Sequence, residues 1–140
     1  MPYPIHTLLI RTAHRQQNAL RPALGELGLS TGQPKVLRCL AARGPCSQRE
    51  LADRCDVDPA AICRLLDGME RSGLLERRPS KADRRTGEVH LTDQGRRALQ
   101  AWEERCLDFE TQMLEGFSEG EKQQLRDFLE RAYRNVGGRP

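Results

Sequence analysis

Residues 47–72, SQRELADRCDVDPAAICRLLDGMERS, decide the fold. Their first four letters have capping-box spacing, which predicts a short helix through about residue 54. Asp58 and Pro59 suit the cap and the first position of a second helix, and Gly73 suits its left-handed end. Two short helices joined by a tight turn, the second with a polar outer face, have the shape of a helix-turn-helix. An ordinary antiparallel helix pair is the alternative.

The next residues predict two strands around a basic loop. Residues 74–78 form one strand candidate, and residues 88–91 alternate polar and apolar side chains as a half-buried strand does. Within residues 77–85, five basic residues stand against Asp83 alone. Strand, basic loop and strand directly after a helix-turn-helix make a winged helix, whose loop can place arginines against phosphates or in the minor groove. A solvated hairpin is the alternative.

Amphipathic helices are predicted on both sides of this unit. A first helix spans residues 4–27, with a kink or break near Leu20–Arg21 because Pro22 interrupts it. A second begins at Ser30, which has capping-box spacing to Gln33. After the wing, a long helix from about residue 93 to 117 and a last helix from 118 to 136 are expected. The predicted parts are an N-terminal dimerisation helix, a winged helix-turn-helix DNA-binding domain and C-terminal dimerisation helices, at residues 1–29, 30–92 and 93–140.

The predicted fold class is mainly α: a winged helix-turn-helix of about six helices plus a two-stranded wing. The apolar stripes of the terminal helices are more than this small core can cover. Burying one medium apolar side chain is worth about 1.5–3 kcal/mol, so a dozen left exposed would be untenable. We therefore expect a symmetric homodimer in which both terminal regions interlock.

Composition argues against several classes of protein. The chain has 140 residues, of which 37% are hydrophobic and 31% charged. No apolar run is long enough for a transmembrane helix, and the N-terminus does not resemble a secretory signal. The five cysteines lack metal-ligand spacing, and no catalytic or phosphate-loop motif occurs. We expect a cytoplasmic protein that is no enzyme, with no metal, cofactor or membrane partner.

A series of short motifs follows in order along the middle of the chain: Gly28-Leu29-Ser30, Gln33, Val36-Leu37, 47–52, Val57-Asp58, Ile62, 64–67, Met69-Glu70, 73–78, 83–85, Val89, Leu91-Thr92 and Gly95. This ordered series resembles the MarR family of bacterial transcription regulators. The most specific part is Asp-Arg-Arg followed by Leu-Thr-x-x-Gly. The resemblance implies a homodimer with recognition helix 58–72 in the major groove and wing 79–88 at the minor groove. Such proteins usually repress nearby genes and release DNA when a small aromatic acid, a drug-like compound or an oxidant acts.

Carrying the resemblance over residue by residue gives a set of expected DNA contacts. Arg64 should face DNA from the recognition helix, Arg84 or Arg85 should form the wing tip, and Asp83 should orient a neighbouring arginine by ion pairing. The full predicted set is Ser47, Gln48, Pro59, Ala60, Cys63, Arg64, Arg71, Arg77, Lys81, Arg84 and Arg85. Alanines and a cysteine stand where the family usually has Ser or Thr on this helix, which predicts modest base specificity and a large phosphate share.

The releasing signal has two candidate sites. A small aromatic or phenolic ligand would suit the imidazole, guanidinium and indole groups expected at the junction of the first helix, the second helix and the long helix after the wing, namely His6, Arg11, His14 and Trp102. The alternative places Trp102 in a dimer core. Cys63, beside Arg64, is the candidate redox thiol, with a simple small residue near DNA as its alternative.

Cys46 and Cys55 are expected to be buried and inert. A winged helix used only for protein contact is the other class of function, although such a module has no need of the basic wing.

Overall fold

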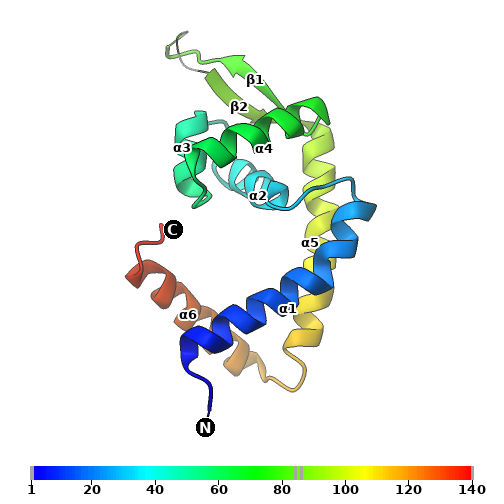
Figure 1. Cartoon of the computed structure of the whole chain (residues 1–140), viewed down its shortest axis with the longest axis vertical. Helices are drawn as coiled ribbons and strands as arrows, with labels where there is room; N and C mark the ends of the chain where they lie inside the picture. Colours follow the sequence, from blue (N-terminus) through cyan, green and yellow to red (C-terminus); the bar gives the residue numbers. More distant parts are fainter. Residues whose placement is uncertain (1, 84, 86, 140) are drawn as a thin grey trace.

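The computed structural model describes residues 2–83, 85 and 87–139, and its fold is mainly helical (Figure 1). Within those residues, six helices and one two-stranded antiparallel sheet follow one another along the chain. Their bounds are α1 Ile5–Glu26, α2 Gln33–Arg43, α3 Gln48–Arg54, α4 Pro59–Arg71, β1 Leu75–Pro79, β2 Gly87–Leu91, α5 Asp93–Met113 and α6 Glu119–Asn135. The winged-helix prediction is confirmed.

One hydrophobic core holds α2, α3, α4 and the sheet together. Its fully buried side chains include Leu37 of α2, Leu51 of α3 and Leu66 of α4. The strands pair in the register Leu75↔Leu91 to Pro79↔Gly87, and Val89 of β2 also bridges to Cys46 ahead of α3. Because this bridge extends the sheet edge to the helix-turn-helix, the wing is built into the core.

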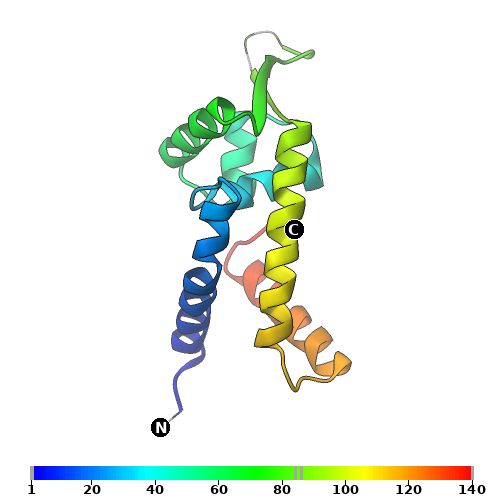
Figure 2. The same cartoon turned by 90° about the vertical axis from the view of Figure 1, so that its right-hand side faces the viewer.

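The terminal helices leave the winged helix on the side opposite the wing (Figures 1 and 2). Helix α1 packs against α5, whereas α6 buries none of its residues within the single chain. Large apolar side chains therefore stay exposed along these three helices and the segment after α5, at Ile5, Leu8, Leu9, Ile10, Leu107, Met113, Phe117, Phe128, Leu129, Tyr133 and Val136.

Several predicted boundaries were wrong. The predicted break near Leu20–Arg21 is absent, because α1 continues through Pro22 as one helix, and the alternative of a kink stays a prediction. Pro22 and Asn18 are both exposed, so water can bond to the Asn18 carbonyl that Pro22 leaves without a donor. Helix α2 begins at Gln33 rather than Ser30, because the left-handed Gly32 forms its cap. Only the return half of the expected capping box forms there, from the Ser30 N–H to the Gln33 side chain (3.0 Å).

The sheet and the long helix also differ from expectation. Strand β1 is shifted one residue toward the C-terminus, because residue 74 continues the turn that follows α4 and its N–H bonds to the Met69 carbonyl. Helix α5 ends at Met113 rather than near residue 117. The chain then turns through Gly116, which has a left-handed conformation.

Candidate nucleic-acid interface

Helix α4 presents the polar face expected of a recognition helix. Its buried side is Ile62, Leu66 and Met69, which anchors it to the core. Pro59 occupies the first turn, where its missing N–H has no partner to lose. On the opposite side of the helix, the exposed residues include Ala60, Cys63, Arg64, Asp67 and Arg71.

Helix α3 and the turn before α4 fix this face. The Ser47 hydroxyl accepts the Glu50 N–H (3.1 Å), so the predicted cap of α3 is formed. Gln48 is half-buried at the start of α3. Asp56, in the turn, has φ 52°, a left-handed conformation that Asp tolerates better than most residues. The turn therefore sets how α4 projects from α3.

The wing carries exposed cations on a hydrogen-bonded frame. Lys81 and Arg85 are exposed, whereas Arg84, predicted for the wing tip, lies outside the described residues. The Arg85 N–H donates to Asp83 Oδ1 (2.9 Å), which orders the loop. At the base, the Ser80 hydroxyl donates to Glu88 Oε1 (3.2 Å) and accepts the Ala82 N–H.

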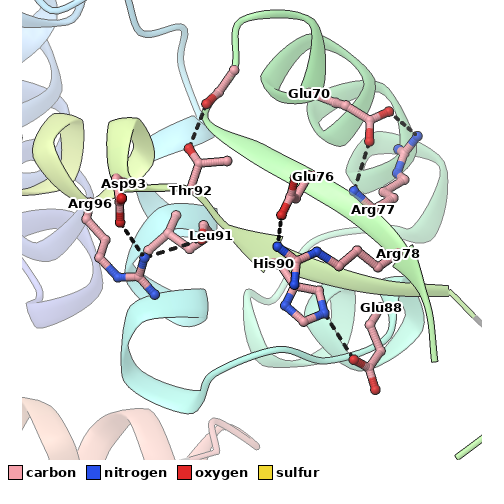
Figure 3. Close-up of polar contacts among 11 residues, drawn as sticks. Glu70, Glu76, Arg77, Arg78, Glu88, His90, Leu91, Thr92, Asp93 and Arg96 are labelled. Atoms are coloured by element: carbon pink, nitrogen blue, oxygen red, sulfur yellow. Dashed lines mark hydrogen bonds and ion pairs between the residues drawn. The ribbon is translucent and has the colours of Figure 1, made fainter. Parts of the chain in front are cut away.

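A neighbouring bond joins Glu88 to His90 (3.1 Å), and both side chains are half-buried (Figure 3). Sequence reasoning missed this Ser80–Glu88 frame, because neither residue belongs to a basic or aromatic pattern. The wing loop is thus anchored on β2 through side chains as well as through the strand ladder.

Arg77 does not extend from the wing. Its guanidinium turns back onto α4, with Nη2 2.8 Å from Asp67 Oδ1 and Nη1 3.7 Å from Glu70 Oε1. The Arg77 backbone N–H also donates to Glu70 Oε2 (2.9 Å), as Figure 3 shows. The next residue, Arg78, is more exposed and pairs with Glu76 on the same strand. Sequence reasoning placed Arg77 with the DNA contacts and assigned no role to Asp67 or Glu70.

The cysteines divide by burial. Cys46 and Cys55 are buried, as predicted, and burial raises the pKa of both thiols, for Cys55 with a further contribution from its hydrogen bond to Cys39. Cys63 is exposed on α4. Among the described residues, no group of three or more His, Cys, Asp or Glu side chains is arranged to hold a metal ion.

A cavity of about 730 Å³ opens between α1, α2 and α5. Leu20, Leu24, Leu99 and Trp102 give it an apolar wall, and its charged lining is Arg21, Lys35, Arg38, Glu103 and Glu110. Arg38 and Glu103 pair across it.

Of the four predicted ligand residues, only Trp102 lines this cavity. Arg11 lines a separate hollow of about 430 Å³ further along α1, and His6 and His14 line neither. The cations of α2 were missed because nothing in their local pattern places them opposite α5. No helix in the described part of the chain has the length and apolar character needed to cross a membrane.

Comparison with known proteins gives a consistent result. The MarR family model matches residues 29–86. The transcriptional repressor YetL of Bacillus subtilis is 34% identical over 110 residues, covering 74% of this chain and 66% of YetL, just under two thirds of its length. A putative transcriptional regulatory protein for the hcr operon of Thauera aromatica is 30% identical, covering 81% of this chain and 68% of that protein.

Structural comparison agrees. The crystal structure of a MarR-family transcriptional regulator from Silicibacter pomeroyi superposes with a TM-score of 0.80 at 26% identity, covering 92% of this chain and 87% of that one. Family model, relatives and fold coincide on the same winged helix. The chain therefore belongs to the MarR family of transcription regulators.

Proposed function

We propose that the chain is a homodimeric repressor that binds an inverted repeat in double-stranded DNA and releases it when a small aromatic or phenolic ligand binds. The observation that carries the proposal is the exposed outer face of α4 beside the cationic wing. The proposed contacts are Ser47, Gln48, Pro59, Ala60, Cys63, Arg64, Arg71, Lys81, Arg84 and Arg85. The similarity to the transcriptional repressor YetL also supports the repressor role.

Arg64 is the central residue of this interface. It is exposed midway along α4, and no hydrogen bond or ion pair holds its side chain among the described residues. A guanidinium in that position can donate two hydrogen bonds to a guanine edge in the major groove. Its neighbours Ala60 and Cys63 offer only small apolar or weakly polar contacts, so most base discrimination falls on Arg64.

The exposed apolar faces of α1 and α6 support the homodimer. Side chains such as Ile10, Phe128 and Val136 are more than half exposed in the single chain. A monomer rarely leaves so large an apolar surface in water. In the proposed domain division, residues 1–29 and 93–140 form the dimer and residues 30–92 bind DNA.

The cavity between α1, α2 and α5 supports the ligand. Its volume suits a small organic molecule. Trp102 provides an aromatic wall, and Lys35, Arg21 and Arg38 provide cations for an acid or phenol. Of the predicted ligand residues, this proposal retains Trp102. It replaces the two histidines with cations of α1 and α2.

A thiol signal is the second candidate, because Cys63 is the exposed cysteine and lies on the α4 face. Oxidation there would add bulk and charge where phosphate is expected. Peroxide treatment of wild type and Cys63→Ser separates the two signals. Release by peroxide in wild type alone would assign the signal to Cys63.

Selection of bound duplexes from a random DNA library tests the main proposal. We expect an enriched inverted repeat with half-sites about one helical turn apart. On that duplex, Arg64→Ala should bind roughly tenfold to hundredfold more weakly, the value of one bidentate base contact. Arg131→Ala, which removes the same charge from exposed α6, is the matched control. Unenriched binding, or equal binding by both variants, would refute the proposal.

A further inference from the structure

We propose that Arg77 is a positioning residue: it fixes the wing relative to the recognition helix through Asp67 and Glu70, and makes no phosphate contact of its own. The inference rests on the DNA binding proposed above, and it assigns Arg77 a different role from the other cations of residues 77–85.

The first support is the number of bonds that one residue makes to α4. The Arg77 guanidinium reaches Asp67 at 2.8 Å and Glu70 at 3.7 Å. Its backbone N–H donates to the other oxygen of Glu70 at 2.9 Å. Side chain and main chain of one strand residue are thus both held by the same helix, and the Arg77 side chain is only 32% exposed, against 58% for Arg78.

The strand register explains why Glu70 is needed. Arg77 stands opposite Val89 in the sheet, and the Val89 N–H donates to the Cys46 carbonyl rather than to β1. The Arg77–Val89 pair therefore exchanges no ladder bonds, and the Arg77 N–H points away from β2. The Glu70 carboxylate satisfies this donor and joins β1 to the C-terminal half of α4.

The position of Asp67 explains why an arginine is needed. Ala60, Arg64, Asp67 and Arg71 follow one another at spacings of four, three and four residues, which places all four on one stripe of α4. This stripe is the proposed DNA face, where an unpaired carboxylate would repel phosphate. Arg77 neutralises Asp67 in place, and its planar fork can serve two carboxylates at once, which a lysine ammonium does less well.

The functional consequence is a fixed angle between α4 and the wing, the two elements proposed to contact DNA. Among the described residues, α4 and β1 are otherwise linked through the short turn at residues 72–74 and through core packing. Helix α4 and the wing can bind DNA together when their relative placement matches the positions of the two grooves. The Arg77 bonds supply that placement before DNA is present, so less ordering has to accompany binding.

The sign of one substitution tests the proposal. Asp67→Asn and Asp58→Asn each remove one negative charge from the α4 region, and Asn remains a good cap at position 58. If only Coulomb repulsion mattered, both variants would bind the selected duplex more tightly. We expect Asp67→Asn to bind about fivefold more weakly, a change of the size expected for the loss of coupling within one ion-pair network. Asp58→Asn should bind no more weakly than wild type.

Salt dependence separates positioning from phosphate contact. The logarithm of the binding constant falls as the logarithm of the salt concentration rises. Loss of one phosphate contact makes this slope less steep by about 0.9. We expect Arg77→Gln to bind more weakly with the slope unchanged, and the Asp67→Asn/Arg77→Gln double variant to bind no more weakly than the worse single variant. Arg77→Lys should recover part of the affinity, since an ammonium can hold one carboxylate. Tighter binding by Asp67→Asn, or a reduced slope for Arg77→Gln, overturns the proposal.

A measurement without DNA keeps this inference separate from the proposed function. In the free protein, the Arg77 amide should exchange its hydrogen slowly in wild type and rapidly in Glu70→Ala, while the Met69 amide in the body of α4 stays protected in both. If wild type selects no DNA but shows this pattern, the DNA-binding proposal fails and the Arg77 contacts stand. Rapid exchange at Arg77 in wild type overturns the positioning role.

Discussion

Gly95 lies where the first turn of α5 meets the start of the wing, and Gly95→Ala tests that junction. A Cβ built at Gly95 would lie 2.1 Å from the Leu74 carbonyl oxygen and 2.7 Å from Cδ1 of Leu91. Both distances are below the 3.0 Å that real Cβ atoms essentially never undercut. Because the nearer atom belongs to the backbone, a side-chain rotation cannot relieve the contact.

Two effects set the size of the expected change. Alanine is favoured over glycine inside a helix by about 0.5–1 kcal/mol, and this gain is smaller in a first turn. Overpacking costs about 1–3 kcal/mol, and a clash with backbone belongs at the upper end. The free energy of unfolding should therefore fall by about 2 kcal/mol, which lowers the thermal midpoint by roughly 6 °C for a chain of this size.

Urea and thermal unfolding at one fixed subunit concentration measure this change, since the stability of a dimer depends on concentration. Gly68→Ala in α4 is the matched control. Its Cβ would lie 3.7 Å from Gln33 Nε2, an ordinary contact, so helix propensity alone should act and the midpoint should hold or rise. Equal stability of the two variants would refute the reasoning that α5 and β1 are in tight contact.

Three further changes have defined outcomes. Thr92→Ala removes the cap of α5 and its 2.6 Å bond to the turn after α4, so urea unfolding should show a loss of about 1–2 kcal/mol, mostly restored by serine. The hydrogen bond to Asp56 raises the pKa of Tyr133 in the folded protein. The stability that this bond contributes to the fold is therefore complete below the unfolded pKa of about 10 and is lost as pH rises through the folded pKa. Tyr133→Phe should therefore flatten the alkaline fall in unfolding free energy. At neutral pH a thiol reagent should modify exposed Cys63 at once and Cys55 only after unfolding, as timed absorbance of the released thiolate would show.

The winged helix was predictable because its signals are local. The cap at Ser47, the proline at residue 59 and the alternation at residues 88–91 each report on the few residues around them. Pro22 shows a limit of such signals, because the break that it predicts in α1 is absent. A proline removes one hydrogen bond, but packing of α1 along α5 can hold a helix that its sequence alone would interrupt.

The site was predictable only as far as exposure. The outward positions of Arg64 and Arg71 follow from helix periodicity, and the structure has both exposed. The direction of Arg77 does not follow, because its partners lie seven and ten residues earlier on another element. A run of charge gives the composition of a surface but not which members are held by neighbouring carboxylates.

The position of the cavity suggests how a ligand would reach the DNA-binding face. Helix α2 contributes Lys35 and Arg38 to the cavity while its Val36 and Leu37 are fully buried in the winged-helix core. The opposite walls, α1 and α5, carry the exposed apolar side chains of the proposed dimer. A bound molecule that separates Arg38 from Glu103 would therefore act on the winged-helix core and on the proposed dimer helices at once. It would shift α2 relative to α1 and α5. Since α4 packs on the same core, its spacing to the partner's α4 would change, and an inverted repeat tolerates only one spacing.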